Sequence, residues 1–363
     1  MTRFTHPSMP DRQKLDKYLD SIYKSKWLTN NGPLVRELTV RLEEYLGVEN
    51  LLLVSSGTMG LQIAYRALGI SGASDDGQAE VITTPFTFIA TESSLRWEGV
   101  RPRFADIRPD TFNLCPEKTA ELIGSNTRAI VPVHVYGNPC DVDAFDEIST
   151  NSDLKLVYDA AHAFGVQMNG ESVLNNGDAS ILSFHATKVF HTVEGGGVVF
   201  KDPDALYRAR ASRNFGFDPE TGDIKSLGIN GKMSEVNAAF GLALLDDIDA
   251  IFQRRMELLA MYSEALPDFV TQPIWAKGAT RTAAYMPVLF QTSVDRNTCE
   301  KALADAEIPS RRYFSPLLGG WDETDRLEVA DSVADRILCL PLYADMSMDL
   351  VRKVLAAVSG ARG

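Results

Sequence analysis

The sequence is poor in cysteine and lacks the motifs that cysteines usually form. Its 363 residues include only four, at positions 115, 140, 299 and 339, and these are widely spaced. No CxxC pair occurs, so neither a zinc knuckle nor a redox pair is predicted. Scattered single thiols are typical of proteins in a reducing compartment. We therefore expect a cytoplasmic protein with four free thiols and no metal site.

Long apolar runs and an excess of positive charge are also lacking. The longest apolar stretches, such as residues 238–245, are far shorter than the roughly 18 to 20 residues that cross a bilayer, and the first residues do not resemble a signal peptide. The chain has 36 Lys and Arg against 49 Asp and Glu, a formal net charge of −13. This balance argues against a nucleic-acid surface but leaves room for a local basic pocket. We expect no membrane and no nucleic-acid partner.

What the sequence does contain is a regular alternation of short apolar runs and amphipathic stretches. Two helices are predicted first, over residues 11–27 and 34–46. The alternation that follows is typical of βαβ units, an α/β fold with a mostly parallel sheet between helices. The predicted strands are 51–54, 80–83, 103–105, 129–133, 156–158, 180–184 and 197–200. The helices predicted with them are 57–68, 87–97, 141–149 and 204–214.

The last third of the chain changes character. Residues 234–266 are predicted to form one long, nearly unbroken helix, a span that often crosses from one domain to another. A strand over 284–290 and helices over 296–306 and 349–358 follow. We therefore expect two domains: residues 1–244, with an N-terminal segment and the large domain, and a smaller α+β domain over 245–363. Residues 71–78 are predicted to be a polar loop.

Three segments place reactive groups just after a predicted strand, where ligands of such sheets gather. In the first, Val54-Ser-Ser-Gly-Thr-Met-Gly60, a strand enters a helix through small residues. Free backbone N–H groups at that helix start, with the hydroxyls of Ser56 and Thr58, would suit a phosphate. The same hydroxyls would also suit an ordinary helix cap.

In the second segment, Asp159 directly follows an apolar strand, and a carboxylate there needs a partner. That partner is either a ligand cation or the N-terminus of a helix that Asp159 caps. His162 lies one helical turn further on, as a neighbour of the ligand or as an ordinary structural residue.

In the third segment, Lys188 stands among apolar and small residues, between a strand that ends near Ser183 and the glycines 195–197. Lysines are mostly surface residues, but apolar surroundings lower the pKa of the amine and make it a nucleophile for carbonyls. The glycines alone would also suit a turn between two strands.

A phosphate cradle, a carboxylate and a lysine at the strand ends of one sheet together match the needs of pyridoxal 5′-phosphate (PLP). The phosphate needs a helix start, the aldehyde a lysine amine, and the pyridine nitrogen a carboxylate that keeps it protonated. A Rossmann oxidoreductase would instead show G-x-G-x-x-G after the first strand, and the turn at residues 55–60 does not fit that pattern.

Further motifs resemble the DegT/DnrJ/StrS family of PLP-dependent nucleotide-sugar aminotransferases, which have the aspartate aminotransferase fold. The resemblance covers nearly the whole chain. Besides the three segments, it rests on Pro85-Phe-Thr-Phe-Ile-Ala-Thr91, Pro132-Val-His-Val-Tyr-Gly137, Arg213-Asn-Phe-Gly216, Gly228-Ile-Asn-Gly-Lys-Met-Ser-Glu235 and Leu340-Pro-Leu-Tyr343.

The resemblance implies a role for each matching residue. Lys188 would form the Schiff base with PLP and later act as the acid–base group, and Asp159 would pair with the pyridine nitrogen. His162 would lie near the PLP O3′, and Phe88 would stack on the ring. The residues expected at the phosphate are Gly57, Thr58 and Ser183.

Other matching residues concern a second subunit and the sugar. Asn230 would reach the PLP phosphate of the neighbouring subunit, so the expected unit is a homodimer with shared active sites. The residues expected near the nucleotide-sugar substrate are Asn31, Lys232 and Tyr313.

The implied reaction moves an amino group from L-glutamate, which leaves as 2-oxoglutarate, through the pyridoxamine form of the cofactor to a nucleotide-linked keto-6-deoxy sugar. We expect dTDP-4-keto-6-deoxyglucose to become dTDP-4-amino-4,6-dideoxyglucose. A 3-keto sugar is the alternative within the family. Dehydratase relatives carry His in place of the lysine, so Lys188 favours a transaminase, and Lys188 with Asp159 argues against a non-catalytic regulator. A structural or interaction protein stays open as a third option, which would leave the pKa of Lys188 unshifted. The pathway, lipopolysaccharide or another product, stays open.

Overall fold

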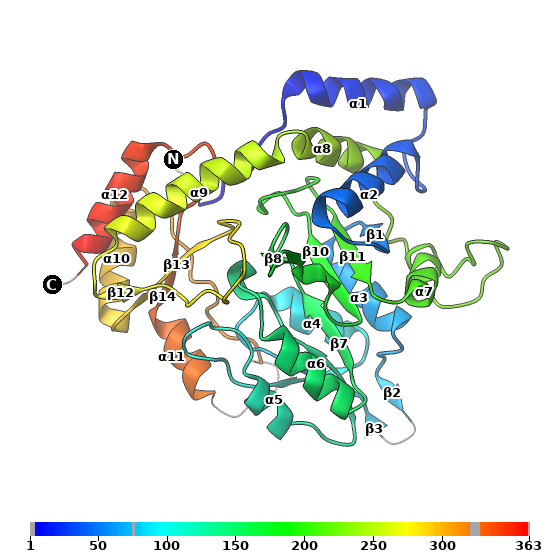
Figure 1. The fold of residues 1–363 in the computed structure, drawn as a ribbon, viewed down its shortest axis with the longest axis horizontal. Helices are drawn as coiled ribbons and strands as arrows, with labels where there is room; N and C mark the ends of the chain where they lie inside the picture. Colours follow the sequence, from blue (N-terminus) through cyan, green and yellow to red (C-terminus); the bar gives the residue numbers. More distant parts are fainter. Residues whose placement is uncertain (1–3, 75–76, 320–326, 362–363) are drawn as a thin grey trace.

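A seven-stranded sheet forms the centre of the computed structural model, which describes residues 4–74, 77–319 and 327–361 (Figure 1). Strand β11 is antiparallel to both of its neighbours, β1 and β10, and the pairs from β10 to β5 are all parallel. The mostly parallel sheet predicted from the sequence is therefore confirmed. Across the sheet the strands are β1 (Leu51–Val54), β11 (Gly196–Phe200), β10 (Ala179–Ser183), β7 (Lys155–Asp159), β6 (Thr127–Val131), β4 (Glu80–Thr83) and β5 (Arg101–Phe104).

Helices cover both faces of this sheet (Figure 1), which explains why β1 and β11 are buried along their whole length. Successive residues of β1 enter different cores: Leu51 and Leu53 pack in one apolar cluster, Leu52 and Val54 in another. The helices of this part are α1 (Arg12–Ser25), α2 (Pro33–Leu46), α3 (Gly57–Ala67), α4 (Ile89–Trp97), α5 (Pro116–Glu121), α6 (Val142–Asn151), α7 (Pro203–Arg213) and α8 (Glu235–Leu245).

The C-terminal part has a sheet and an apolar core of its own. Strand β13 pairs antiparallel with both β12 and β14, and the cluster around Leu258, Val288 and Val354 is separate from the two cores of the large sheet. The separate sheet and core agree with the smaller C-terminal domain expected from the sequence. The domain boundary at residue 245 stays a prediction. The elements are α9 (Ile248–Ala265), β12 (Val270–Thr271), β13 (Met286–Phe290), α10 (Ser293–Asp305), α11 (Glu328–Arg336), β14 (Ile337–Leu340) and α12 (Met348–Ser359).

The nearly unbroken helical pattern over residues 234–266 is confirmed in its extent, but it forms two helices and not one. Helix α8 ends at Leu245 and α9 begins at Ile248, and Figure 1 shows α9 running from the end of α8 toward α12. Two acidic residues form the junction: Arg41 of α2 binds the Asp246 carboxylate at 2.8 Å, and Lys14 of α1 binds that of Asp247 at 2.5 Å. These partners are distant in sequence, and neither Gly nor Pro marks the break.

Residues 71–78 are also more regular than predicted. Strands β2 (Ala73–Ser74) and β3 (Gly77–Gln78) pair as a short antiparallel hairpin, and residues 75 and 76 of the predicted loop lie outside the described residues. The sequence analysis also missed α5, α11, β12, β14, the 3-10 turns Val135–Gly137 and Val173–Asn175, and the hairpin of β8 (Gln167–Met168) with β9 (Glu171–Ser172). Most of these are too short for a periodic signal.

Two compositional expectations can be checked directly. All four cysteines are free, as predicted. Among the described residues, no helix combines the length and the apolar character needed to cross a membrane.

Candidate active site

A cavity of about 290 Å³ lies where the strands of the large sheet end. Its wall includes residues that follow β1, β4, β6, β7 and β10, the carboxyl edge at which ligands of such sheets bind. The C-terminal part closes it with Tyr285, Tyr313 and Phe314. Seven residues expected at the cofactor line it together: Gly57, Thr58, Phe88, Asp159, His162, Ser183 and Lys188.

The start of α3 forms one end of the cavity. Ser56 caps this helix by accepting a hydrogen bond from the Met59 N–H at 3.1 Å, so the cap interpretation holds for Ser56. The N–H groups of Gly57 and Thr58 belong to the first turn, where no intrahelical acceptor is available. The Thr58 side chain is exposed at the cavity wall, and the exposed Phe88 lies at the start of α4.

At this end of the cavity, glycines allow the start of α3, the end of β10 and the start of β11 to approach one another closely. A Cβ on Gly57 would lie 3.0 Å from the Ser183 Cβ, and one on Gly196 would lie 2.7 Å from the Gly57 backbone nitrogen. The first turn of α3 is thus pressed against the end of β10 and the start of β11. Because Gly196 and Gly197 belong to strand β11, their interpretation as a turn is wrong.

Asp159 is the last residue of β7 and is only 6% exposed. Its carboxylate accepts hydrogen bonds from the Thr91 hydroxyl at 2.8 Å and from the Ala161 N–H at 3.1 Å. Burial raises the pKa of Asp159, while these two donors and the charge of Lys188 act in the opposite direction. No helix begins after Asp159 in this described stretch, so the helix-cap interpretation is wrong.

His162 is buried and neutral. Its Nδ1 accepts a hydrogen bond from the Tyr136 N–H at 3.2 Å, which assigns the ring proton to Nε2. Burial, and secondarily the charge of Lys188, holds the pKa of His162 well below its usual value. The ring lies parallel to that of Phe314, with centroids 5.9 Å apart.

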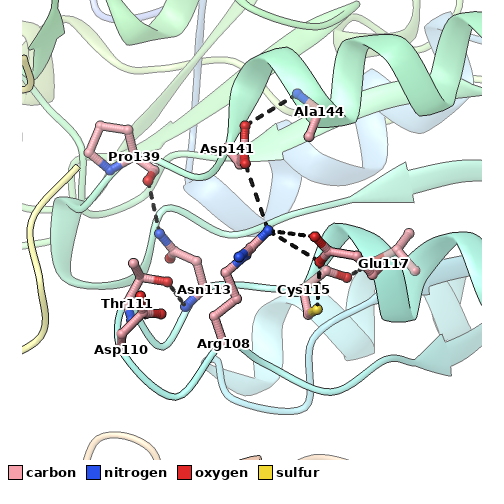
Figure 2. A network of polar contacts seen from close by, with 10 residues as sticks. Arg108, Asp110, Thr111, Asn113, Cys115, Glu117, Pro139, Asp141 and Ala144 are labelled. Atoms are coloured by element: carbon pink, nitrogen blue, oxygen red, sulfur yellow. Dashed lines mark hydrogen bonds and ion pairs between the residues drawn. The ribbon is translucent and has the colours of Figure 1, made fainter. Parts of the chain in front are cut away.

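Polar contacts hold the loop of residues 135–139, which supplies the Tyr136 N–H; part of this network is drawn in Figure 2. Asn113 accepts a hydrogen bond from the Val135 N–H and donates to the carbonyls of Asn138 and Pro139, each at 3.0 Å. Figure 2 also shows Arg108 between Glu117 and Asp141, and Asp141 accepting from Ala144 at the start of α6. The contacts of Asn113 therefore hold the backbone that donates to His162.

Lys188 lies in the loop of residues 184–195 that joins β10 to β11. Its Nζ is 3.2 Å from the Tyr285 hydroxyl. Burial lowers the pKa of Lys188 to about 8, although the charge of Asp159 opposes this. At pH 7 about a tenth of such amines are neutral, against far less than 1% at the ordinary pKa. Lys188 is therefore suited to take up and release a proton near neutral pH.

The residues expected at the sugar (Asn31, Lys232 and Tyr313) and at the partner's cofactor (Asn230) are not all brought together. Tyr313 lines the cavity, whereas Asn31, Asn230 and Lys232 do not. Asn31 and Asn230 are exposed, and the Lys232 amine donates to the Asn214 side chain at 2.9 Å. The roles expected of these three residues stay predictions.

The sequence analysis missed three residues of this site. Thr91 belongs to a quoted motif, but its position as the third residue of helix α4 gives no sign of its bond to Asp159. Tyr285 and Phe314 come from the C-terminal part, where no motif marks them. Only the folding of two distant segments together reveals them.

PLP fits the residues that are present. The glycine-lined start of α3 suits its phosphate, Asp159 suits the pyridine nitrogen, and Lys188 is an amine with a lowered pKa in the same cavity. The residues that would hold the cofactor are Gly57, Thr58, Phe88, Asp159, His162, Ser183 and Lys188.

Comparisons with known proteins point the same way. The family model described as the DegT/DnrJ/EryC1/StrS aminotransferase family matches residues 10–359. The dTDP-4-amino-4,6-dideoxy-D-glucose transaminase of Shigella dysenteriae is 40% identical over 98% of this chain and 97% of its own. The GDP-perosamine synthase of Escherichia coli O157:H7 is 28% identical over 97% of this chain and 96% of its own.

A solved structure agrees with these sequences. DesI, crystallised in the presence of its TDP-sugar product, superposes with a TM-score of 0.90 at 36% identity, covering 98% of this chain and 92% of that one. With the fold, the cavity and these matches together, the chain belongs to the DegT/DnrJ/EryC1/StrS aminotransferase family and is a PLP-dependent transaminase.

Proposed function

We propose that the enzyme transfers an amino group from L-glutamate to dTDP-4-keto-6-deoxyglucose and forms dTDP-4-amino-4,6-dideoxyglucose. The observation that carries the aminotransfer is Lys188, an amine with a lowered pKa in one cavity with Asp159 and the start of α3. The choice of sugar is supported by the full-length similarity to the Shigella transaminase and to DesI. Amination of a 3-keto isomer is the alternative.

Each cavity residue has a role in this proposal. PLP, when bound, supplies the electron sink for the reaction. Gly57, Thr58 and Ser183 bind its phosphate, and Asp159 in its ionised form keeps the pyridine nitrogen protonated. Lys188 removes the proton from the amino-acid Cα and returns a proton to the product side, so it has to start each transfer as a neutral amine.

Two further neighbours orient the cofactor. His162 donates from Nε2 near the cofactor O3′, since its Nδ1 is occupied by the Tyr136 N–H. The exposed ring of Phe88 covers the pyridine face when the cofactor is present.

The working unit in this proposal is a homodimer in which Asn230 completes the site of the partner. Support comes from the segment before Asn230, where apolar side chains are unusually exposed: Phe215 (50%), Leu227 (68%) and Ile229 (44%). Leu227 and Ile229 also line an apolar groove beside α3. A second copy would cover these residues. We further propose a cytoplasmic location, in keeping with the free thiols, and a product destined for lipopolysaccharide or another glycan.

The visible absorption spectrum of the purified protein tests the first half of this function. With PLP, we expect an absorption band that L-glutamate bleaches and 2-oxoglutarate restores, and that Lys188→Ala abolishes. Candidate nucleotide-keto sugars are then offered to the glutamate-treated enzyme, and the product is analysed by NMR for the aminated carbon. A band that glutamate leaves unchanged, or restoration by the 3-keto isomer alone, would contradict the proposed donor or sugar.

A further inference from the structure

Tyr285 occupies a junction that the sequence motifs do not mark. It directly precedes β13 and lines the main cavity together with two small cavities, one behind Lys188 and one beside Tyr136. Its hydroxyl lies 3.2 Å from the Lys188 Nζ, and no other hydrogen bond of this hydroxyl is found within the described part of the chain. Among the described residues, the segment that leads into the C-terminal sheet thus provides the one hydrogen-bond partner found for the reactive amine.

A buried arginine fixes the backbone that carries Tyr285. Arg255 of α9 is only 6% exposed, and its guanidinium donates to the carbonyls of Ala283 at 2.9 Å and Ala284 at 3.0 Å. These are the two residues before Tyr285. Because the guanidinium is planar, its two hydrogen bonds fix the directions of both carbonyl groups. The backbone of Tyr285, which follows them, therefore has little freedom to move.

Aromatic neighbours fix the ring itself. The Tyr285 centroid is 4.7 Å from that of His162 and 5.8 Å from those of Tyr136 and Tyr313. Burial raises the pKa of Tyr285 above its ordinary value, so the group stays a neutral phenol in the working range of the enzyme. A neutral phenol accepts one hydrogen bond and donates one, but it does not act as a base.

We propose that the Tyr285 hydroxyl is a further catalytic group, which accepts a hydrogen bond from Lys188 when the lysine carries the transferred proton and so holds the amine in position to return it. The inference rests on the proposed aminotransfer. The proton passes from the substrate carbon to Nζ, which becomes an ammonium, and passes back from Nζ to the acceptor carbon. Tyr285 keeps its own proton throughout, and no other reactant is needed.

The proposal predicts the direction in which the pKa of Lys188 changes when the Tyr285 hydroxyl is removed. A hydrogen bond to a charged donor is stronger than one to its neutral form, so the phenol favours the ammonium over the amine. Removing the hydroxyl therefore lowers the pKa of Lys188, by about half a unit to one unit for the loss of one such bond. Within the described ranges, the other titratable groups that line the cavities on either side of Lys188 are unchanged in the variant: Asp159, His162, His185, Glu194 and Tyr313 in the main cavity, and His6, Arg255 and Tyr343 in the small one.

The test uses cofactor-free protein, so that it measures the ionisation of the Lys188 amine and does not depend on turnover. Lys188 is labelled with a trace of acetic anhydride from pH 6 to 11, and its modified peptide is quantified by mass spectrometry. The midpoint of labelling is expected to fall in Tyr285→Phe relative to the wild type. Tyr262→Phe is the matched control: it removes a buried hydroxyl that donates to the Pro341 carbonyl in the C-terminal core, away from the cavity, and leaves the midpoint unchanged.

Kinetics provide a second measurement. In the loaded enzyme, Tyr285→Phe is expected to lower kcat for glutamate about tenfold with KM nearly unchanged, because the lost contact acts on the transferred proton and not on binding. If Tyr285→Phe does not fold, 3-fluorotyrosine at position 285 weakens the acceptor without changing its shape, and the midpoint moves in the same direction.

The outcomes separate the two proposals. A labelling midpoint that is unchanged or raised in Tyr285→Phe overturns the role of Tyr285, whatever the substrate. Absence of sugar amination with a lowered midpoint overturns the proposed function and leaves the Lys188–Tyr285 contact established.

Discussion

Lys188 combines reactivity with a cost to stability. The amine is charged in the unfolded chain, and burial disfavours that charge in the folded protein. A group whose pKa is lower when folded binds fewer protons in the native state, so it destabilises the fold below its folded pKa of about 8. This penalty shrinks as the pH rises toward the ordinary lysine pKa, where both states lose the proton.

Replacing this lysine by an apolar residue of similar length is therefore expected to stabilise the cofactor-free protein. We predict that Lys188→Met raises Tm at pH 7 by about 1 to 3 °C, since the partly accessible site reduces the full effect. The gain is expected to vanish near pH 10. Thermal unfolding at several pH values measures it, with the exposed Lys17→Met as the control. A gain that persists at pH 10 would assign the effect to packing.

At the scale of elements, one buried carboxylate connects two helices. Helix α2 begins after Gly32 and has no capping side chain of its own. Glu235, the first residue of α8, supplies the cap instead: its two oxygens accept from the Leu34 and Val35 N–H groups at 2.8 and 3.0 Å. Figure 1 shows α2 and α8 lying together near α1. The start of α2 therefore depends on a residue about 200 positions later.

We predict that Glu235→Gln lowers the free energy of unfolding by about 1 to 3 kcal/mol, because the amide replaces one acceptor by a donor and removes the charge that favours a helix N-terminus. Urea unfolding followed by circular dichroism measures the change. Glu37→Gln, at an exposed position on the capped helix α2, serves as the control and is expected to change little. Equal stability of the two variants would contradict the capping role.

The close approach of β11 to α3 leads to a second prediction for these elements. Gly196→Ala places a methyl group 2.7 Å from the Gly57 backbone nitrogen, so the helix start has to move away from the strand. We expect the affinity for PLP to fall at least tenfold, as measured by fluorescence titration of the cofactor-free protein. Gly124→Ala meets no atom within 4 Å and is the matched control. Unchanged affinity would place the phosphate elsewhere.

Elements with local signals were predicted well, and those set by distant contacts were not. Strands β1 and β4 have the predicted bounds, because each is a short apolar run between clear breaks. The break at Asp246 was missed because neither Gly nor Pro marks it, and its contact with Arg41 joins helices that are distant in sequence. Likewise Asp159 and Lys188 follow strands and could be found, whereas Tyr285 and Thr91 reach the site only through tertiary packing.

For the whole molecule, the homodimer is the main expectation that remains to be measured. We predict that Leu227→Asp shifts the enzyme toward monomer and lowers PLP occupancy, because a charge is placed on the apolar segment that a second copy would cover. Sedimentation velocity over a dilution series, with absorption of the bound cofactor, tests both effects. Val294→Asp alters an equally exposed apolar residue on α10 and serves as the control. A fully active monomer would remove the shared site.

The contact between Lys188 and Tyr285 also has a consequence for the order of folding. The two residues are 97 positions apart: Lys188 lies in the loop between β10 and β11 of the large sheet, and Tyr285 directly precedes β13 of the C-terminal sheet. Contacts of such high sequence separation close late, after the loop entropy between them has been overcome. During synthesis, a nascent chain that has not yet emerged past residue 285 already holds its lysine but lacks the partner for it. Lys188 therefore gains the reactivity that it has in the folded enzyme only when the last third of the chain has folded.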